Sequence, residues 1–267
     1  MKVIDAHIHV DLYSLDEREL LLEQLGDSVE AVIAVSMNVE SCITNLELAG
    51  QYPGKYYPAF GYHPELSVPD LETEKRLFTW IREHQSEAIA IGEVGLPYYN
   101  RTDTEAQGKL FDLKPYIALL DQFIQLAAGL NKPIILHAVY EDADIVCDLL
   151  EKHGVTAAHF HWFKGSERTV KRMAGNGYYI SITPDVCYEE EIRELVRSYP
   201  IEQLMVETDG PWPFEGKFAG TTTLPNMVRD VIVEIAQLKG MTVEEASVQL
   251  YENTKRFYHI CKLIKLI

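Results

Sequence analysis

The sequence has few of the features that mark secreted or membrane-bound proteins. No apolar run approaches the roughly 18 residues that a membrane-spanning helix needs, and no basic and apolar leader opens the chain. We therefore expect neither membrane insertion nor secretion. The cysteines are few, widely spaced and without a Cys-x-x-Cys pair, standing at Cys42, Cys147, Cys187 and Cys261. This spacing favours reduced, buried thiols in a cytoplasmic protein.

Positive charge is also scarce. The chain holds 24 Lys and Arg against 41 Asp and Glu, which gives a net charge of −17. Such a protein repels a phosphate backbone unless its charge is segregated or metal ions neutralise the site. The charge balance predicts that there is no broad nucleic-acid-binding surface, and it leaves the oligomeric state open.

No linker rich in proline, glycine or serine divides the chain, and no repeat or low-complexity tract is evident. Apolar residues make up 47% and charged residues 24%, as in ordinary globular enzymes. We therefore expect one domain over residues 1–267.

Short apolar runs alternate with longer amphipathic stretches along the whole chain. The runs with strand length are 3–10, 31–36, 56–62, 88–93, 133–137, 156–161, 178–182 and 203–207. The stretches with helical spacing include 15–25, 72–84, 104–130, 142–153, 168–174, 189–198, 227–238 and 243–258. Eight apolar strands separated by helices predict the α/β class, most simply a single (β/α)8 TIM-type barrel. A doubly wound open sheet is the alternative, but its first strand would usually lead into a glycine-rich turn, where this chain has histidines.

The predicted first strand carries two histidines close to its end, in Asp5-Ala6-His7-Ile8-His9. Residues two apart on a strand point the same way, so His7 and His9 can bind one ion from one side. Imidazole suits zinc, iron, nickel and copper, and carboxylate partners add manganese and magnesium. The alternative is a pair of core or surface histidines without a ligand.

Further ligand-type side chains stand at the ends of other predicted strands. They are Glu93 on strand four, His137 on strand five, His159 and His161 on strand six, and Glu207 and Asp209 on strand eight. In a barrel these ends meet at one rim, so a cluster of four histidines and two carboxylates could be drawn from these side chains and the histidines of the first strand. Such a cluster exceeds the needs of one four-coordinate ion and fits a two-metal site, with Glu93 as the candidate bridge. Taken singly, each residue could instead be a hydrogen-bonded polar group of the core.

The parts of this cluster suggest a hydrolytic mechanism. Two divalent ions would lower the pKa of a water molecule and polarise the bond to be cleaved. Asp209 is the candidate general base, with Glu93 as its catalytic partner. His63, in Gly61-Tyr62-His63-Pro64, could contact the substrate or the leaving group, or it could simply cap a turn.

An ordered set of motifs resembles the TatD-like metal-dependent hydrolases, often called TatD DNases, over the length of the chain. The motifs are Asp5-Ala6-His7-Ile8-His9, Gly61-Tyr62-His63-Pro64, Ile91-Gly92-Glu93-Val94-Gly95-Leu96, Pro133-Ile134-Ile135-Leu136-His137, His161-Trp162-Phe163-Lys164-Gly165-Ser166, Glu207-Thr208-Asp209-Gly210-Pro211 and Asn253-Thr254. The resemblance implies a barrel with two divalent metals in the cleft. One ion would be bound by His7, His9, Glu93 and Asp209, and the other by Glu93, His137 and His161. It also assigns the strand-six ligand to His161, which leaves His159 as a supporting or core residue.

The sequence departs from this family at three places. Relatives have an aspartate where this chain has Pro97, and an arginine where it has Val139. The relatives' Arg-Asn-x-Pro motif is replaced by Thr222-Thr223-Leu224-Pro225. Two of these changes remove cations that could hold a phosphate.

Other side chains could serve the substrate. The remaining candidates for phosphate contact are Lys164, Arg101 and Arg168, although for each a solvated surface position is the favoured interpretation. Aromatic residues after strands four, six and eight could line the pocket, stack on a base or simply pack; these are Tyr98, Tyr99, Trp162, Trp212 and Phe214.

These observations predict a metal-dependent hydrolase, most simply a phosphodiesterase or deoxyribonuclease that acts on DNA or a small phosphodiester in the barrel mouth. An ester or amide hydrolase, such as a D-aminoacyl-tRNA deacylase, is the alternative, and a non-catalytic metal-binding barrel is the third possibility. Zinc, manganese, magnesium and iron all fit the ligand set.

Overall fold

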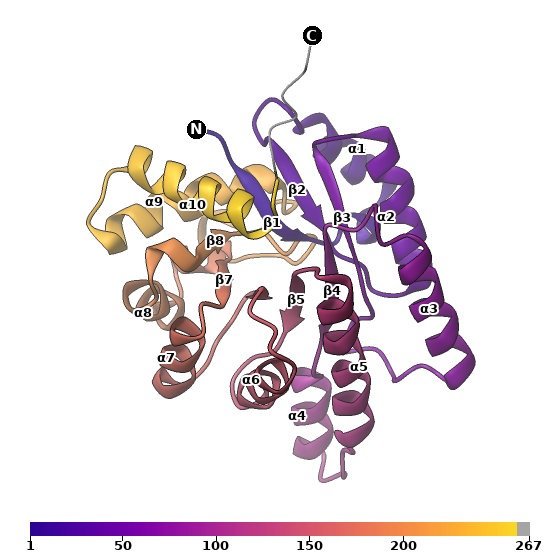
Figure 1. The fold of residues 1–267 in the computed structure, drawn as a ribbon. Coiled ribbons are helices and arrows are strands. Elements are labelled where there is room, and N and C mark those ends of the chain that lie inside the picture. Colours follow the sequence, from indigo (N-terminus) through magenta and orange to yellow (C-terminus); the bar gives the residue numbers. More distant parts are fainter. Residues whose placement is uncertain (261–267) are drawn as a thin grey trace.

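Eight parallel strands alternate with helices around a common axis (Figure 1). The structure is a computed structural model that describes residues 1–260, so the predicted thiol of Cys261 lies outside the described residues. The strands pair in chain order from β1 to β8, and the barrel is nearly closed. They are β1 (Ile4–Ile8), β2 (Ala31–Ala34), β3 (Tyr56–Phe60), β4 (Ala90–Gly95), β5 (Ile134–His137), β6 (Ala158–Phe160), β7 (Tyr179–Ile182) and β8 (Leu204–Val206). The predicted (β/α)8 barrel is confirmed; the single-domain boundary at residue 267 stays a prediction.

The helices surround the strands on the outside of the barrel (Figure 1). They are α1 (Leu15–Glu23), α2 (Val39–Gln51), α3 (Leu71–Glu83), α4 (Tyr98–Ala106), α5 (Lys114–Leu130), α6 (Asp142–His153), α7 (Glu167–Gly175), α8 (Glu190–Ser198), α9 (Val228–Lys239) and α10 (Val243–Phe257). Short 3-10 turns lie at Val10–Leu12, Pro184–Cys187, Ile201–Gln203, Gly216–Phe218 and Pro225–Met227. Among residues 1–260, none of the helices has the length and apolar character to cross a membrane.

Two features of the helices differ from the sequence pattern. The single helix expected over residues 104–130 is wrong, because α4 begins earlier, at Tyr98, and α5 begins anew at Lys114. Gly108 has a left-handed φ of +73° that ends the first helix, and Pro115 lies in the first turn of the second, where proline is tolerated. The pattern also did not single out α2, although Asn38 caps its N-terminus by accepting a hydrogen bond from the Ser41 amide.

Two apolar clusters hold the barrel together. The larger one lies between the strands and the surrounding helices, while the smaller one fills the barrel interior below the rim. The interior cluster combines small strand residues such as Ala6 and Ala59 with Tyr251, Phe257 and Tyr258, which come from α10 and its C-terminal end. The interior beneath the rim is therefore packed, which leaves the rim itself, at the C-terminal ends of the strands, for polar side chains.

Irregular strand pairing occurs where the site residues stand. On β1 the pairing with β2 shifts between Asp5 and Ile8, and on β4 the pairing with β5 shifts between Ile91 and Val94. Ile91 and Val94 are three residues apart, yet both belong to the outer cluster. The bulge therefore interrupts simple alternation and re-aims the side chains between them, which include Glu93.

Asp5 joins the first strand to the last. Its Oδ1 accepts hydrogen bonds from the Thr208 amide (3.0 Å) and the His7 amide (3.3 Å), and its Oδ2 accepts one from Thr208 Oγ1 (2.5 Å). Two backbone hydrogen bonds continue this closure, from the Asp209 amide to the His7 carbonyl (3.0 Å) and from the His9 amide to the Gly210 carbonyl (2.9 Å). The first strand and the segment after the last strand are thus fixed to each other beside His7 and His9.

Replacing Asp5 with Ala is expected to lower the free energy of unfolding by about 3 kcal/mol, because the buried Thr208 donors lose their acceptor. Chemical denaturation followed by circular dichroism measures this. Asp103, an exposed residue of α4, provides the control, and its replacement by Ala is expected to change the value by less than about 0.5 kcal/mol. Equal values for the two variants would show that Asp5 does not contribute to closure.

Candidate metal centre

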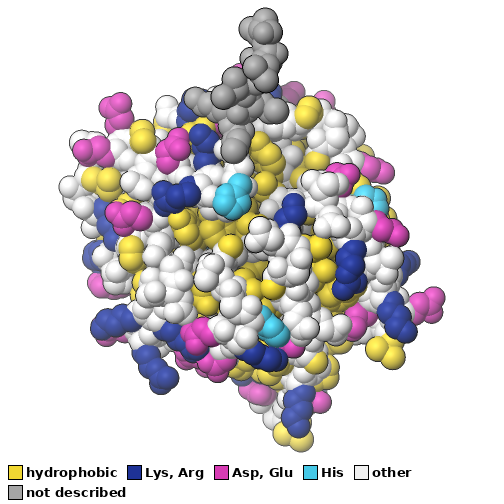
Figure 2. Space-filling view, in the orientation of Figure 1, with side chains coloured by type: hydrophobic (Ala, Val, Ile, Leu, Met, Phe, Trp, Pro, Cys, Tyr) yellow, Lys and Arg dark blue, Asp and Glu magenta, His cyan; other side chains and the backbone are white. Residues whose placement is uncertain are grey.

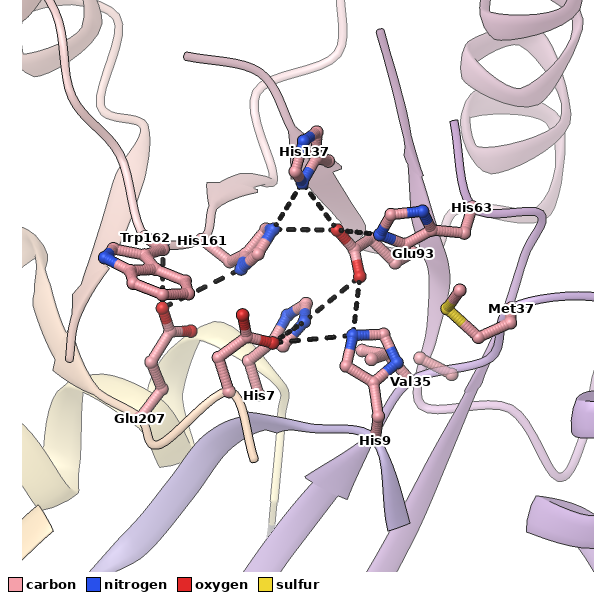
Figure 3. A network of polar contacts seen from close by, with 12 residues as sticks. His7, His9, Val35, Met37, His63, Glu93, His137, His161, Trp162 and Glu207 are labelled. Atoms are coloured by element: carbon pink, nitrogen blue, oxygen red, sulfur yellow. Dashed lines mark hydrogen bonds and ion pairs between the residues drawn. The ribbon is translucent and has the colours of Figure 1, made fainter. Parts of the chain in front are cut away.

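Glu93 lies at the centre of a buried cluster at the C-terminal ends of the strands (Figure 3). Its Oε2 is 3.2 Å from His7 Nε2 and 3.1 Å from His9 Nε2. Its Oε1 is 3.1 Å from His137 Nδ1 and 2.7 Å from His161 Nε2. The two oxygens of one carboxylate therefore face two different pairs of imidazoles.

Asp209 completes the side of the cluster that contains the first strand. Its Oδ1 is 3.2 Å from His7 Nε2 and 3.4 Å from His9 Nε2. The residue has a φ of +49°, a left-handed conformation that costs free energy in a non-glycine residue. The backbone hydrogen bonds between β1 and the segment after β8 hold this conformation, which brings the carboxylate over the histidines.

The cluster contains polar atoms that a cation would satisfy. Among residues 1–260, eight buried nitrogen and oxygen atoms of the six predicted ligands have no hydrogen-bond partner: His7 Nδ1 and Nε2, His9 Nδ1, both carboxylate oxygens of Glu93, His137 Nε2, His161 Nδ1 and Asp209 Oδ1. Ligand atoms of three residue groups also lie within 4.8 Å of one another; the groups are His7–His9–Glu93, His7–His161–Asp209 and His63–Glu93–His137. Buried polar groups without partners are costly, so this donor set fits divalent metal ions.

The electrostatics of the cluster favour charged carboxylates. Burial alone would raise the pKa of Glu93, but the imidazoles of His161, His63 and His7 hold it well below its usual range. Burial would likewise raise the pKa of Asp209, and the nearby imidazoles of His7 and His9 lower it instead. Both groups are thus ionised at neutral pH, which is the form that binds a cation.

The pKa values of the imidazoles differ according to their carboxylate neighbours. Burial opposes protonation of His9 and His137, but the carboxylates next to them raise each pKa to about 9. Burial dominates at His161 and lowers its pKa to about 4. Without metal, protons therefore occupy part of the cluster, and metal binding has to displace them.

His63, the predicted substrate residue, lies beside the cluster and is mostly buried. Its Nε2 is 3.4 Å from Glu93 Oε1, and its Nδ1 accepts a hydrogen bond from the Glu65 amide (3.2 Å). An accepting Nδ1 in the neutral ring leaves the proton on Nε2, which then acts as a donor. His63 therefore caps the turn through the Glu65 amide. Its contact with the substrate stays a prediction.

Glu65 supports the centre, although the sequence pattern did not single it out. Its Oε1 is 3.5 Å from His137 Nε2, and its two oxygens accept hydrogen bonds from the Tyr99 amide (3.0 Å) and the Asn100 amide (2.8 Å). Glu65 therefore connects the N-terminal turn of α4 with one imidazole of the cluster. Its position directly after the Gly61-Tyr62-His63-Pro64 motif was the available signal.

A buried hydrogen-bonded chain lies behind His161. Glu207 Oε1 accepts a hydrogen bond from the Trp162 amide (2.7 Å), and its Oε2 accepts one from Ser181 Oγ (2.5 Å). The chain continues from Ser181 Oγ to His159 Nε2 (2.5 Å) and from His159 Nδ1 to the hydroxyl of Tyr258 (2.7 Å). His159 thus belongs to the interior of the barrel, and burial holds its pKa well below the usual value.

A cavity of about 620 Å³ opens above the cluster. It is lined by His9, Met37, His63, Glu65, Leu66, Tyr99, Asn100, His137, Val139, His161, Trp162, Asp209 and Trp212. This volume lies within the range of about 300–1,000 Å³ that is typical of small-molecule sites. Of the predicted aromatic wall, Tyr99, Trp162 and Trp212 line the cavity, while Tyr98 and Phe214 are not among its lining residues.

All six predicted ligands converge at one rim of the barrel, and their role as ligands stays a prediction. A (β/α)8 barrel with a cluster of histidines and carboxylates at this rim is typical of metal-dependent hydrolases. The family model described as "TatD related DNase" matches residues 4–259. The chain belongs to the TatD family and is a metal-dependent hydrolase.

Individual relatives agree with this assignment. A Haemophilus influenzae protein named as an uncharacterized metal-dependent hydrolase is 36% identical, over 97% of this chain and 100% of its own length. A Methanocaldococcus jannaschii protein with the same description is 30% identical, over 97% of each chain. The crystal structure of YjjV, a TatD homologue from Escherichia coli, has a TM-score of 0.83 and 25% identity, and covers 96% of this chain and 98% of its own.

Proposed function

We propose that this protein is a two-metal phosphodiesterase that cleaves DNA or a small phosphodiester in the barrel mouth. The observation that carries the proposal is the orientation of Glu93, whose Oε2 faces His7 and His9 while its Oε1 faces His137 and His161. One carboxylate between two sets of imidazoles is the arrangement expected of a bridging ligand. Zinc, manganese, magnesium and iron are all compatible with these ligands.

When bound, the ions would lower the pKa of a water molecule and neutralise charge on the phosphoryl group. The chain's own residues supply the rest of the chemistry. Asp209 directs Oδ1 at His7 and His9, so its Oδ2 is the atom left to accept the proton of the water. His63, with its proton on Nε2, is placed at the cavity to donate to the leaving oxygen. Hydrolysis would yield a phosphomonoester and an alcohol.

Ester or amide hydrolysis, as in a D-aminoacyl-tRNA deacylase, is the second candidate. It is favoured by the apolar side chains of the cavity, among them Met37, Leu66 and Val139, which suit an acyl group. We propose a cytoplasmic location for either activity, supported by the buried free thiols of Cys42 and Cys147.

The test is to strip the protein with chelator, reload it separately with each metal, and assay bis(4-nitrophenyl) phosphate, single-stranded DNA, a nitrophenyl ester and aminoacyl-tRNA. We expect turnover of the phosphodiesters that chelator abolishes and that metal restores, with two ions per chain by elemental analysis. His259→Ala, at an exposed imidazole outside the cluster, should behave as the unmodified protein. Turnover of the esters alone would favour the second candidate, and a failure to cleave any phosphodiester would overturn the proposal.

A further inference from the structure

Trp162 forms a rigid wall of the cavity directly beside the cluster (Figure 3). Its amide donates to Glu207 Oε1 (2.7 Å), and its indole Nε1 donates to Asp185 Oδ2 (2.6 Å). Asp185 is itself buried and accepts a hydrogen bond from Thr183 Oγ1 (2.5 Å). Hydrogen bonds at the backbone and at the tip of the side chain thus fix the indole before any substrate arrives.

Two further aromatic side chains line the same cavity and are open to solvent. The exposed fractions are 57% for Trp212 and 49% for Tyr99. Thr223 Oγ1 donates to the Trp212 carbonyl (2.5 Å), which anchors the backbone of this aromatic residue at the cavity. Val139 adds an apolar surface to the same cavity.

The polar residues of the cavity outside the cluster are already paired with each other. Asn100 Nδ2 donates to the Glu65 carbonyl, and the Glu65 carboxylate accepts the amides of Tyr99 and Asn100. The wall therefore offers a substrate mainly aromatic faces and aliphatic groups.

The basic side chains that could have served a phosphate are engaged or placed elsewhere. Arg101 forms ion pairs with Glu141 (3.0 Å) and Asp142 (2.8 Å). Lys164 lines a separate groove between α7 and α8, and Arg168 is exposed on α7. On the face of the molecule shown in Figure 2, Lys and Arg side chains lie scattered among acidic ones rather than gathered in a stripe.

From these features we infer that the site selects a single phosphodiester flanked by uncharged planar groups, one of which stacks on Trp162. The inference rests on the proposed phosphodiesterase function and specifies its substrate class. The cluster can neutralise the one phosphate at the reaction centre. A further phosphate would lie against aromatic and apolar walls, where an unpaired charge is costly, and the net charge of −17 would repel it at longer range.

The experiment compares four substrates with the metal-loaded protein at low ionic strength: bis(4-nitrophenyl) phosphate, thymidylyl-thymidine, its 5′-phosphorylated form, and a single-stranded oligothymidylate. We expect kcat/KM per scissile bond to be about tenfold higher for thymidylyl-thymidine than for either more highly charged nucleotide, since the extra charge is not paired in the cavity. Val139→Arg should reduce this preference by supplying a cation at the wall.

Variants of Trp162 test the proposed stacking contact. Trp162→Ala is expected to lower kcat/KM on thymidylyl-thymidine about tenfold, mainly through KM, while Trp162→Phe keeps most of the activity. Trp80→Phe is the matched control, because Trp80 packs on Phe60 and His84 away from the cavity. Quenching of tryptophan fluorescence by thymidylyl-thymidine measures binding independently of turnover, and it should be reduced by Trp162→Ala but retained in Trp80→Phe.

The possible outcomes distinguish failure of the inferred substrate selectivity from failure of the proposed phosphodiesterase function. Efficient cleavage of bis(4-nitrophenyl) phosphate together with an equal or greater preference for the oligonucleotide would overturn the inference and leave the phosphodiesterase function intact. Unchanged kinetics and quenching in Trp162→Ala would also overturn it. Failure to cleave any of the four substrates would overturn the proposed function, and the inference with it.

Discussion

Replacement of Glu93 with Gln is expected to lower kcat/KM on a phosphodiester by about 10³-fold and to reduce the bound metal from the proposed two ions to one or none. The amide has nearly the shape of the carboxylate, but it has lost the negative charge and one of the two acceptor oxygens. Both Glu93 oxygens face imidazoles in the buried cluster, so one side of the centre loses its ligand oxygen and the other keeps only a neutral one. Elemental analysis and steady-state kinetics on the same preparation measure the two effects.

Glu87→Gln is the control for this experiment. Glu87 is exposed and lies just before β4, at the opposite end of the strand from the rim. The same chemical change there is expected to leave metal content and activity unchanged. If Glu93→Gln retained two ions and most of its activity, the bridging role would be refuted.

The barrel could be predicted from the sequence because its signal is repeated eight times. Each buried strand reads as a short apolar run, and an error in one run does not change the class. The error over residues 104–130 shows the limit of this reasoning. Both α4 and α5 have helical spacing, and the break between them is marked by the backbone conformation at Gly108 and by Pro115 in the first turn of α5.

The convergence of the ligands was predictable for a related reason. In a parallel barrel, residues at the C-terminal ends of different strands meet at one rim whatever their separation in sequence. His7 and Asp209 are far apart in the chain, yet their side chains are 3.2 Å apart. Strand-end position alone was sufficient to bring Glu93, His137 and His161 to the same cluster.

The directions in which the side chains of the site point were not predictable from strand alternation. The bulges on β1 and β4 change the register where His7 and Glu93 stand, and such bulges leave no reliable pattern in a single sequence. The supporting residues were also hidden. Asp5 and Asp185 act through hydrogen bonds to Thr208 and Trp162, which are formed only once distant strands are adjacent.

Replacement of Asp209 with Asn is expected to lower kcat about 10³-fold while KM changes by less than about threefold, because the amide cannot accept a proton from the attacking water. Metal content should be largely retained, since the amide oxygen can take the place of Oδ1 near His7 and His9. Kinetics on bis(4-nitrophenyl) phosphate, combined with elemental analysis, separate the loss of a base from the loss of a ligand.

Asp230→Asn provides the comparison, because Asp230 pairs with Lys217 on the surface of α9 and the change should not affect kcat. Full activity in Asp209→Asn would show that another group accepts the proton. Loss of activity together with loss of metal would make Asp209 a ligand without a role as base. The Asp209 backbone is left-handed and holds the carboxylate over His7 and His9. Only a variant that is folded, metal-loaded and inactive would agree with this carboxylate as the group that activates water.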